Sequence, residues 1–333
     1  MSEIKAHVIV GGGGVGKTTL VTNLSLHSAL KGQRTLAMTF DPSLRLKDLL
    51  TEEVTDQTQN LEVFLIDPAQ IFEHLLGQIH PEEARAFKNN RLFGYLLEGI
   101  VGLQEFTSLY YLVEMMKSQK YDVIYVDTPP FQNALEFFYA PEKFRKLFES
   151  KILRLFIESE NENFITHFIK SSSRMALKTL QSLTGLEFFK QLLDFIRILE
   201  TVRPTVLNTL NEIEKGFKTG SVLVDYISAY GIENVIQADD FLSELKGIDL
   251  QVKRYYVSKF MGRGLGHILE RQGLEMAEPL RQFLQKKTAE SQIVEKHLQD
   301  LSNKHKVSII RVPYFNSSMK PKEIAKKWDE HTG

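Results

Sequence analysis

The sequence predicts a doubly wound α/β fold with a mostly parallel sheet and an inserted helical subdomain. Three observations lead to this prediction: strand-like and helical segments alternate along most of the chain, three strand candidates run directly into an aspartate, and one long central segment has a helical pattern almost throughout. Strands that alternate with helices pair into parallel sheets covered by helices on both faces, so this order of segments indicates the fold class.

The chain opens with the apolar, β-rich run Ile4–Val10, which predicts a buried strand. Five glycines follow within six positions, and a helical pattern then extends to about Lys31. Gly32 is well placed to end that helix, because glycine adopts the left-handed conformation at a helix C-terminus without strain. This part of the chain therefore predicts a strand, a glycine-rich loop and a helix.

Six further segments have strand character, and the first three of them end at Asp41, Asp67 and Asp127. Open parallel sheets bind ligands at the carboxyl ends of their strands, so the three aspartates predict one functional edge. The six segments are Arg34–Phe40, Leu61–Ile66, Tyr121–Val126, Ser221–Asp225, Val252–Ser258 and Lys306–Val312.

The helical segment extends from residue 141 to 219, with breaks expected near 171–173, 184–185 and 203–204. We interpret it as a subdomain inserted into an α/β domain formed by residues 1–140 and 220–333. Apolar residues recur in it at helical spacing, which favours core packing or a dimer contact over a groove for a hydrophobic protein client. These residues are Phe144, Leu147, Phe148, Ile152, Leu155, Phe156, Phe188, Phe189, Leu192, Leu193, Phe195, Ile196 and Leu199.

The composition is that of a globular protein, with 43% hydrophobic and 25% charged residues. A formal net charge of −1 gives no general attraction to nucleic acid, so no nucleic-acid partner is expected. The absence of cysteine excludes disulfides and thiolate metal sites. No apolar run approaches the roughly 20 residues that span a bilayer, and the charged N-terminus is unlike a signal peptide, so we expect a cytoplasmic location.

The glycine-rich segment matches the phosphate-binding pattern G-x-x-x-x-G-K-[ST]. Glycines let backbone N–H groups converge on an anion, and the N-terminus of the following helix favours negative charge. The lysine can reach the β- and γ-phosphates, and the following threonine can bind Mg²⁺. The segment therefore predicts ATP and ADP binding by a P-loop, composed of Gly11, Gly12, Gly13, Gly14, Val15, Gly16, Lys17, Thr18 and Thr19.

Two of the aspartates are candidates for the chemistry of a P-loop NTPase. Asp127 follows an apolar strand, the position of the Walker B-type acid that holds Mg²⁺ through water, while Thr18 binds the ion directly. Asp41 is a candidate to orient the attacking water, and with Lys17 it forms the predicted catalytic set. A helix cap at Asp41 and a strand–loop turn at Asp127 are the structural alternatives. Asp67 is interpreted as a turn residue without a catalytic role.

These motifs resemble a family of ATPases typified by the arsenite-pump subunit ArsA and by the chaperone that delivers tail-anchored membrane proteins. The family loop, Gly-Lys-Gly-Gly-Val-Gly-Lys-Thr-Thr, is matched at Gly11–Thr19 except at one position. Its first and second switches resemble Asp41–Asp48 and Asp127–Asn133. The segment Val312–Phe315 stands where the family has a proline-containing adenine loop, so the resemblance implies that Pro313 contributes to nucleotide binding.

The resemblance implies a dimer that binds Mg-ATP at its interface, with Asp41 acting on the attacking water and Asp127 on the magnesium. ATP turnover would open and close a helical subdomain that exposes or hides a client groove. The chain also departs from the family. Gly12 replaces the signature lysine, Leu44 and Asn133 replace the switch histidines, and Ser258 stands where relatives have an adenine-reading asparagine. Without cysteine, arsenite pumping is not expected.

Two functions from different classes follow. The first is a dimeric Mg-ATPase that couples its nucleotide state to a protein client or partner, with hydrolysis to ADP and phosphate that is weak or partner-dependent. The second is a non-hydrolysing nucleotide-binding regulator, or a heterodimer partner of a paralogue that supplies the missing lysine. Gly12 is the residue that separates them. A P-loop kinase or ligase is a third hypothesis, for which we find no residues in the sequence that would form a pocket for the phosphate acceptor.

Overall fold

A computed structural model of the chain describes residues 4–39, 45–51, 58–89, 93–95, 102–128, 136–149, 186–260, 278–313 and 319–332. The chain divides into two compact units. The first, here called the sheet unit, comprises Met1–Ile66, Met115–Glu136 and Lys215–Gly333. The second, the helical unit, comprises Asp67–Glu114 and Phe137–Glu214.

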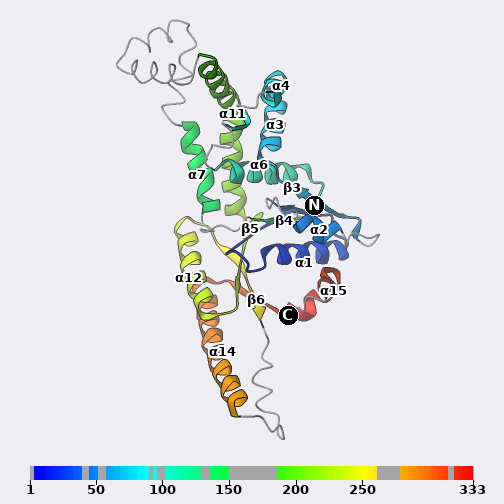
Figure 1. Ribbon diagram of the computed structural model, residues 1–333, viewed down its shortest axis with the longest axis vertical. Coiled ribbons are helices and arrows are strands. Elements are labelled where there is room, and N and C mark those ends of the chain that lie inside the picture. The colour runs from blue at the N-terminus through cyan, green and yellow to red at the C-terminus, as the bar shows by residue number, and fades with distance from the viewer. Residues whose placement is uncertain are drawn as a thin grey trace, which may run out of the picture. The chain divides into compact units, whose positions relative to one another are not determined.

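The sheet unit contains a seven-stranded sheet with the order β3-β2-β4-β1-β5-β6-β7 (Figure 1). Every pair of neighbouring strands is parallel, and helices lie between the strands along the chain, so the predicted doubly wound α/β fold is confirmed. The strands are β1 Lys5–Gly11, β2 Thr35–Thr39, β3 Leu61–Leu65, β4 Val123–Asp127, β5 Val222–Ala229, β6 Val252–Phe260 and β7 Ser308–Pro313.

Strand β1 lies at the point where the strand order changes direction. From β1 the chain builds the sheet outward to β3 on one side, inserts β4 next to β1, and then adds β5 to β7 on the other side. The adjacent strands β2, β4 and β1 are buried along nearly their whole length, as expected when helices cover both faces of a parallel sheet. Ligands of such sheets bind outside the carboxyl ends of the strands at this switch point, which here is the end of β1.

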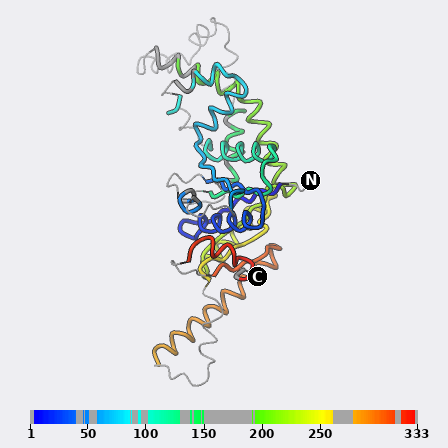
Figure 2. Tube along the Cα trace, turned by 90° about the vertical axis from the view of Figure 1, so that its right-hand side faces the viewer, coloured from blue at the N-terminus to red at the C-terminus, as the bar shows by residue number. Residues whose placement is uncertain are grey.

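One face of the sheet is covered by α1 (Lys17–Leu30) together with α2 (Arg45–Thr51), α15 (Pro321–Lys326) and α16 (Trp328–Thr332). α1 packs against α15, and both views show these segments side by side (Figure 1 and Figure 2). α1 ends as predicted: Gly32 has a φ of 84° and donates its N–H to the carbonyl of Ala29 at 2.9 Å. The core on this face includes Ile9, Leu20, Leu24, Tyr256, Ile324 and Trp328.

The opposite face is covered by α12 (Ile232–Gly247) and α14 (Glu278–His305), which pack on each other (Figure 1). Successive side chains of β5 point to opposite faces of the sheet. Asp225 accepts a 2.7 Å hydrogen bond from His7 in the layer beneath α1, whereas the next residue, Tyr226, stacks on Phe241 of α12 with ring centroids 4.7 Å apart. Successive side chains of a strand point to opposite faces, so these two contacts show that β5 is buried on both sides.

The helical unit is built from α3 (Pro68–Ile79), α4 (Pro81–Asn89), α6 (Leu103–Ser118), α7 (Glu136–Glu149) and α11 (Leu186–Thr219), with α6 and α11 extending across the division. Aromatic side chains form much of its core. Phe144 of α7 stacks on Phe106 at 4.4 Å and touches Phe148 at 5.0 Å, and Phe195 of α11 lies 5.7 Å from Phe93. These described members of the predicted apolar stripe are therefore core residues; Ile152, Leu155 and Phe156 lie outside the described residues.

The limits of the predicted subdomain, residues 141–219, stay a prediction. The helical unit also takes in the helices of residues 67–114, and the predicted boundary at residue 140 falls inside α7. Asp67 caps α3, because its carboxylate accepts hydrogen bonds from the N–H groups of Ala69 and Gln70 at 3.0 and 3.2 Å. None of the described helices is long and apolar enough to cross a membrane.

The predicted break near residues 203–204 is wrong, because α11 runs through Pro204 without interruption. A proline inside a helix costs about 3 kcal/mol, since it lacks an N–H and its ring crowds the preceding turn. Val202, Val206 and Leu210 are fully buried around it. Burial of one such side chain contributes roughly 1.5–3 kcal/mol, so packing of this face outweighs the local cost of the proline.

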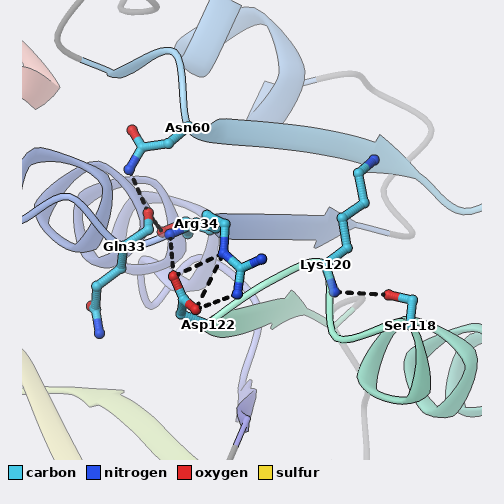
Figure 3. A network of polar contacts seen from close by, with 7 residues as sticks. Gln33, Arg34, Asn60, Ser118, Lys120 and Asp122 are labelled. Atoms are coloured by element: carbon cyan, nitrogen blue, oxygen red, sulfur yellow. Dashed lines mark hydrogen bonds and ion pairs between the residues drawn. The ribbon is translucent and has the colours of Figure 1, made fainter. Parts of the chain in front are cut away.

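A polar network lies at the amino ends of β2 and β4 (Figure 3). Asp122 receives hydrogen bonds from the Arg34 guanidinium at 2.6 Å and from the Arg34 N–H at 2.8 Å. Asn60 donates to the carbonyl of Gln33 at 2.6 Å in the same network. Its hydrogen bond with Arg34 holds the pKa of Asp122 below its ordinary value and raises that of Arg34. The network therefore joins neighbouring strands at the edge of the sheet opposite the P-loop.

Candidate nucleotide-binding site

The P-loop connects the end of β1 to the start of α1, at the switch point of the sheet. β1 ends at Gly11, and α1 begins at Lys17 after the N-cap residue Gly16. Gly14 and Gly16 have φ values of 69° and 100°, both in the left-handed region that favours glycine. Left-handed residues on either side of Val15 turn successive N–H groups toward one side, which forms a concave site for an anion.

Packing requires a glycine at position 11 of the loop but not at position 12. A Cβ atom at Gly11 would lie 2.2 Å from the carbonyl oxygen of Ile227 on β5, so only glycine fits there. A Cβ at Gly12 would meet only Cγ1 of Val15, at 3.7 Å, which is an ordinary van der Waals contact. Gly12 is exposed and outside the left-handed region, so the loop has room for a side chain at this position.

Lys17 is the buried cation of the site. Its ammonium donates hydrogen bonds to the carbonyl oxygens of Gly11 and Gly12 at 2.8 and 2.7 Å, and the residue is 7% exposed. Burial lowers the pKa of Lys17, and the nearby charge of Asp127 opposes that shift. The cation is thus surrounded by dipoles and one carboxylate, in a loop whose N–H groups favour an anion.

Asp127, at the end of β4, lies beside the first residue of the P-loop helix that can bind a metal. Thr18 donates its hydroxyl to Oδ2 of Asp127 at 2.8 Å, and the Thr39 hydroxyl lies 3.5 Å from the same oxygen. Hard oxygen donors of this kind suit Mg²⁺, which is usually held by one or two protein groups together with substrate phosphates. The donor set of Thr18 and Asp127 therefore fits the metal that the sequence predicts.

Thr128 ties the end of β4 to β1 below the loop. Its hydroxyl donates to the carbonyl of Ile9 at 2.8 Å, and the residue is buried. The sequence contains Thr128 within the second switch motif but indicates no separate role for it. The contact holds the strand that carries Asp127 against the strand that carries the P-loop.

The end of β6 also contacts the P-loop, which sequence reasoning missed. Ser258 donates its hydroxyl to the carbonyl of Val15 at 2.6 Å, and the Lys259 ammonium lies 3.3 Å from the carbonyl oxygen of Gly14. The sequence places Ser258 at an adenine-reading position, but its single hydroxyl hydrogen is directed to the P-loop. No motif marks Lys259, and only its proximity to the loop in three dimensions identifies it.

The remaining predicted residues are partly described. Pro313 ends β7 opposite Phe260 of β6, on the same carboxyl edge as the loop but three strands away from β1. Thr19 lies exposed in the first turn of α1, where its carbonyl accepts a 2.7 Å hydrogen bond from Asn23. Asp41, Leu44 and Asn133 lie outside the described residues.

The parallel sheet, the glycine loop at its switch point and the buried lysine together define a P-loop nucleotide-binding protein. A sequence profile of the anion-transporting ATPase family, ArsA_ATPase, matches residues 4–236, and the chain therefore belongs to this family. It is similar to ATPase ASNA1 homolog 1 of Paramecium tetraurelia, with 26% identity over 251 residues that cover 69% of each chain. It is also similar to ATPase get3 of Botryotinia fuckeliana, with 30% identity over 146 residues that cover 42% of this chain and 43% of that protein.

Proposed function

We propose that this chain binds Mg-ATP through its P-loop and hydrolyses it to ADP and phosphate. The observation that carries the proposal is Lys17, a buried ammonium that donates to two loop carbonyls beside a carboxylate, within a loop that concentrates N–H groups. A buried cation with dipolar partners is stabilised further by an anion, and phosphate is the anion that such a loop accommodates. Membership of an ATPase family supports the same activity.

Each group of the site has a proposed role that follows from its chemistry. The loop N–H groups bind the phosphates, and Lys17 neutralises charge on the β- and γ-phosphates. Thr18 and Asp127 would hold the magnesium ion, directly and through water. A bound Mg²⁺ would neutralise charge that develops on the phosphate oxygens during transfer. We keep Asp41 as the proposed residue that orients the attacking water and Pro313 as part of the adenine site.

We further propose that the chain works as a dimer and couples its nucleotide state to a protein client or partner. The support is the resemblance of the loop and both switch motifs to ATPases that work in this way, together with the similarity to the two ATPases above. A homodimer and a heterodimer with a related ATPase both fit this proposal. The helical unit is the proposed client-binding part, and the cytoplasmic location stays a prediction.

The alternative is a regulator that binds nucleotide without hydrolysing it. Gly12 supports this alternative, because it removes the side chain that stands at this place in the family loop. The room for a Cβ atom at Gly12 makes the question testable in this chain, since a lysine can be introduced there without a backbone clash.

The test is steady-state ATP turnover by the purified chain and three variants. We expect slow turnover by the unchanged protein, none by Lys17→Ala, and faster turnover by Gly12→Lys than by the matched control Gly12→Ala. If the unchanged protein and Gly12→Lys both bind Mg-ATP and neither hydrolyses it, the ATPase is rejected and the regulator is favoured. Failure of the unchanged protein to bind nucleotide would reject both.

A further inference from the structure

We infer that Lys259 is a positioning residue of the phosphate site, which acts with Ser258 to aim the N–H groups of the P-loop. This inference rests on the proposed binding of nucleotide at the loop. It assigns the end of β6 to the phosphate side of the site, where the sequence suggested an adenine-reading position.

The end of β6 makes a pair of contacts with consecutive residues of the loop. Ser258 donates to the carbonyl of Val15 at 2.6 Å, and the Lys259 ammonium donates to that of Gly14 at 3.3 Å. The backbone of Ser258 in turn is fixed by its neighbour, because its carbonyl accepts a 2.8 Å hydrogen bond from the N–H of Tyr230. Two adjacent peptide groups of the loop are thus held from one strand end.

The planarity of the peptide group links each held carbonyl to the direction of the next N–H. In a trans peptide the carbonyl of one residue and the N–H of the next point in opposite directions. A carbonyl of Gly14 held toward Lys259 therefore turns the N–H of Val15 away from β6, and a carbonyl of Val15 held toward Ser258 does the same for the N–H of Gly16. N–H groups at these loop positions are the ones that cradle the α- and β-phosphates.

The backbone of β6 is irregular at this point. Lys259 has a φ of 58°, in the left-handed region that a lysine rarely adopts. The pairing of β6 with β7 shifts register between Val257 and Phe260, so Lys259 lies in an irregular turn of the strand rather than in the regular ladder. Residues in such sparsely populated conformations cluster at ligand sites. The irregularity directs a side chain from the strand end to the loop.

A role in orienting the loop predicts equal effects on ADP and ATP, because both contain the α- and β-phosphates. A direct contact of the ammonium with the γ-phosphate predicts a larger effect on ATP. The proposed role of Lys259 also differs from that of Lys17, because the Lys17 ammonium donates to the carbonyls of Gly11 and Gly12 at the other end of the loop.

The experiment measures ADP and ATP affinity of the full chain by calorimetry. Lys259→Met keeps the length of the side chain and removes the charge, and we expect both affinities to fall by about 10-fold, the scale of one hydrogen bond that involves a charged group. Lys259→Arg, which can reach the same carbonyl, should restore both affinities to within about 2-fold. Lys253→Met is the matched control, since Lys253 is an exposed lysine at the other end of β6.

The outcomes separate this inference from the proposed function. Unchanged affinities in Lys259→Met, with binding lost in Lys17→Ala, would overturn the role of Lys259 alone. A loss confined to ATP would also overturn it, in favour of a direct γ-phosphate contact. Absence of binding by the unchanged chain would overturn the proposed function itself. A thermal melt of each variant shows that the fold is intact, and Ser258→Ala tests the second contact, with an expected loss of similar size.

Discussion

The carboxyl and amino ends of the parallel strands, here called the carboxyl edge and the amino edge, each hold a cation by short contacts, but the surroundings of the two cations differ. At the carboxyl edge, the Lys17 ammonium is 2.7 and 2.8 Å from two backbone carbonyls, and the residue is buried. At the amino edge, the Arg34 guanidinium is 2.6 Å from the Asp122 carboxylate, with the two side chains 55% and 33% exposed (Figure 3). The pKa of Lys17 is lowered, whereas that of Arg34 is raised.

The direction of the pKa shift reflects how each cation is surrounded: burial lowers the pKa of Lys17, and a hydrogen-bonded carboxylate raises that of Arg34. Lys17 has lost water and gained mainly neutral partners, so its charged form is disfavoured and a phosphate would stabilise it. Arg34 already has a carboxylate with bidentate geometry, so a further anion would find no unmet charge there. A short distance alone therefore does not distinguish the two cations; burial and the charge of the partner do.

The largest effect is expected at the buried cation. Lys17→Met should weaken ATP binding by about 100-fold or more, because hydrogen bonds to a charged group contribute about 1.5–3 kcal/mol each and Lys17 can bind two phosphates. Calorimetric titration with Mg-ATP measures the change. Arg34→Met serves as the control from the amino edge and should bind ATP as the unchanged protein does; equal losses in both variants would contradict the distinction between the edges.

A smaller effect is expected at the carboxylate of the same edge. Asp127→Asn keeps the shape and an acceptor for Thr18 but removes the charge that would hold Mg²⁺. We expect the gain in ATP affinity on adding Mg²⁺ to fall by about 10-fold, while affinity for ATP in chelator stays nearly unchanged. Titrations with and without magnesium provide the comparison. A loss of the same size in chelator would assign Asp127 a structural role instead.

The lowered pKa of Lys17 predicts that ATP affinity depends on pH. Phosphate binds the protonated lysine, so ATP affinity should fall as the pH rises through the pKa of free Lys17, which lies below the ordinary 10.5. Nucleotide-free stability should change in the opposite sense, since the unfolded chain binds more protons than the folded one in this window and stability rises with pH. Affinity measured as the pH is raised toward 10.5 tests this, and Lys17→Met should show a flat profile.

The smallest effect is expected at the amino edge. The pKa of Asp122 is lowered in the folded state by its hydrogen bonds with Arg34, so its stabilising contribution is present above its ordinary pKa and is lost as the pH falls through the folded value. Asp122→Asn should lower the melting temperature at pH 7 by no more than about 3 °C, because exposed ion pairs contribute little. That difference should decrease as the pH falls below the ordinary pKa of 3.8, and it should shrink in high salt. A difference that persists at low pH would mean that the charge is not responsible.

Sequence reasoning succeeded where the signal is local. The strand–loop–helix at Gly11–Thr19 and the position of Gly32 follow from neighbouring residues, and the alternation of strands and helices indicated the parallel sheet. It failed at Pro204, where a local rule for helix ends was overridden by burial of Val202, Val206 and Leu210 on a helix that packs within its unit. Tertiary packing decides such cases because burial of an apolar helix face contributes more free energy than one proline costs.

What the sequence by itself determined about this protein is its fold class, its family resemblance and the segment that is proposed to bind phosphate, because each depends on consecutive residues or on a repeating pattern. Only the tertiary structure decided which distant residues complete the site. Asp127 reaches Thr18 across 109 positions of the chain, and Lys259 reaches Gly14 across 245. Strand order and register bring these residues together, and hydrophobic periodicity encodes neither, so the contact of the end of β6 with the P-loop could be found only from the tertiary structure.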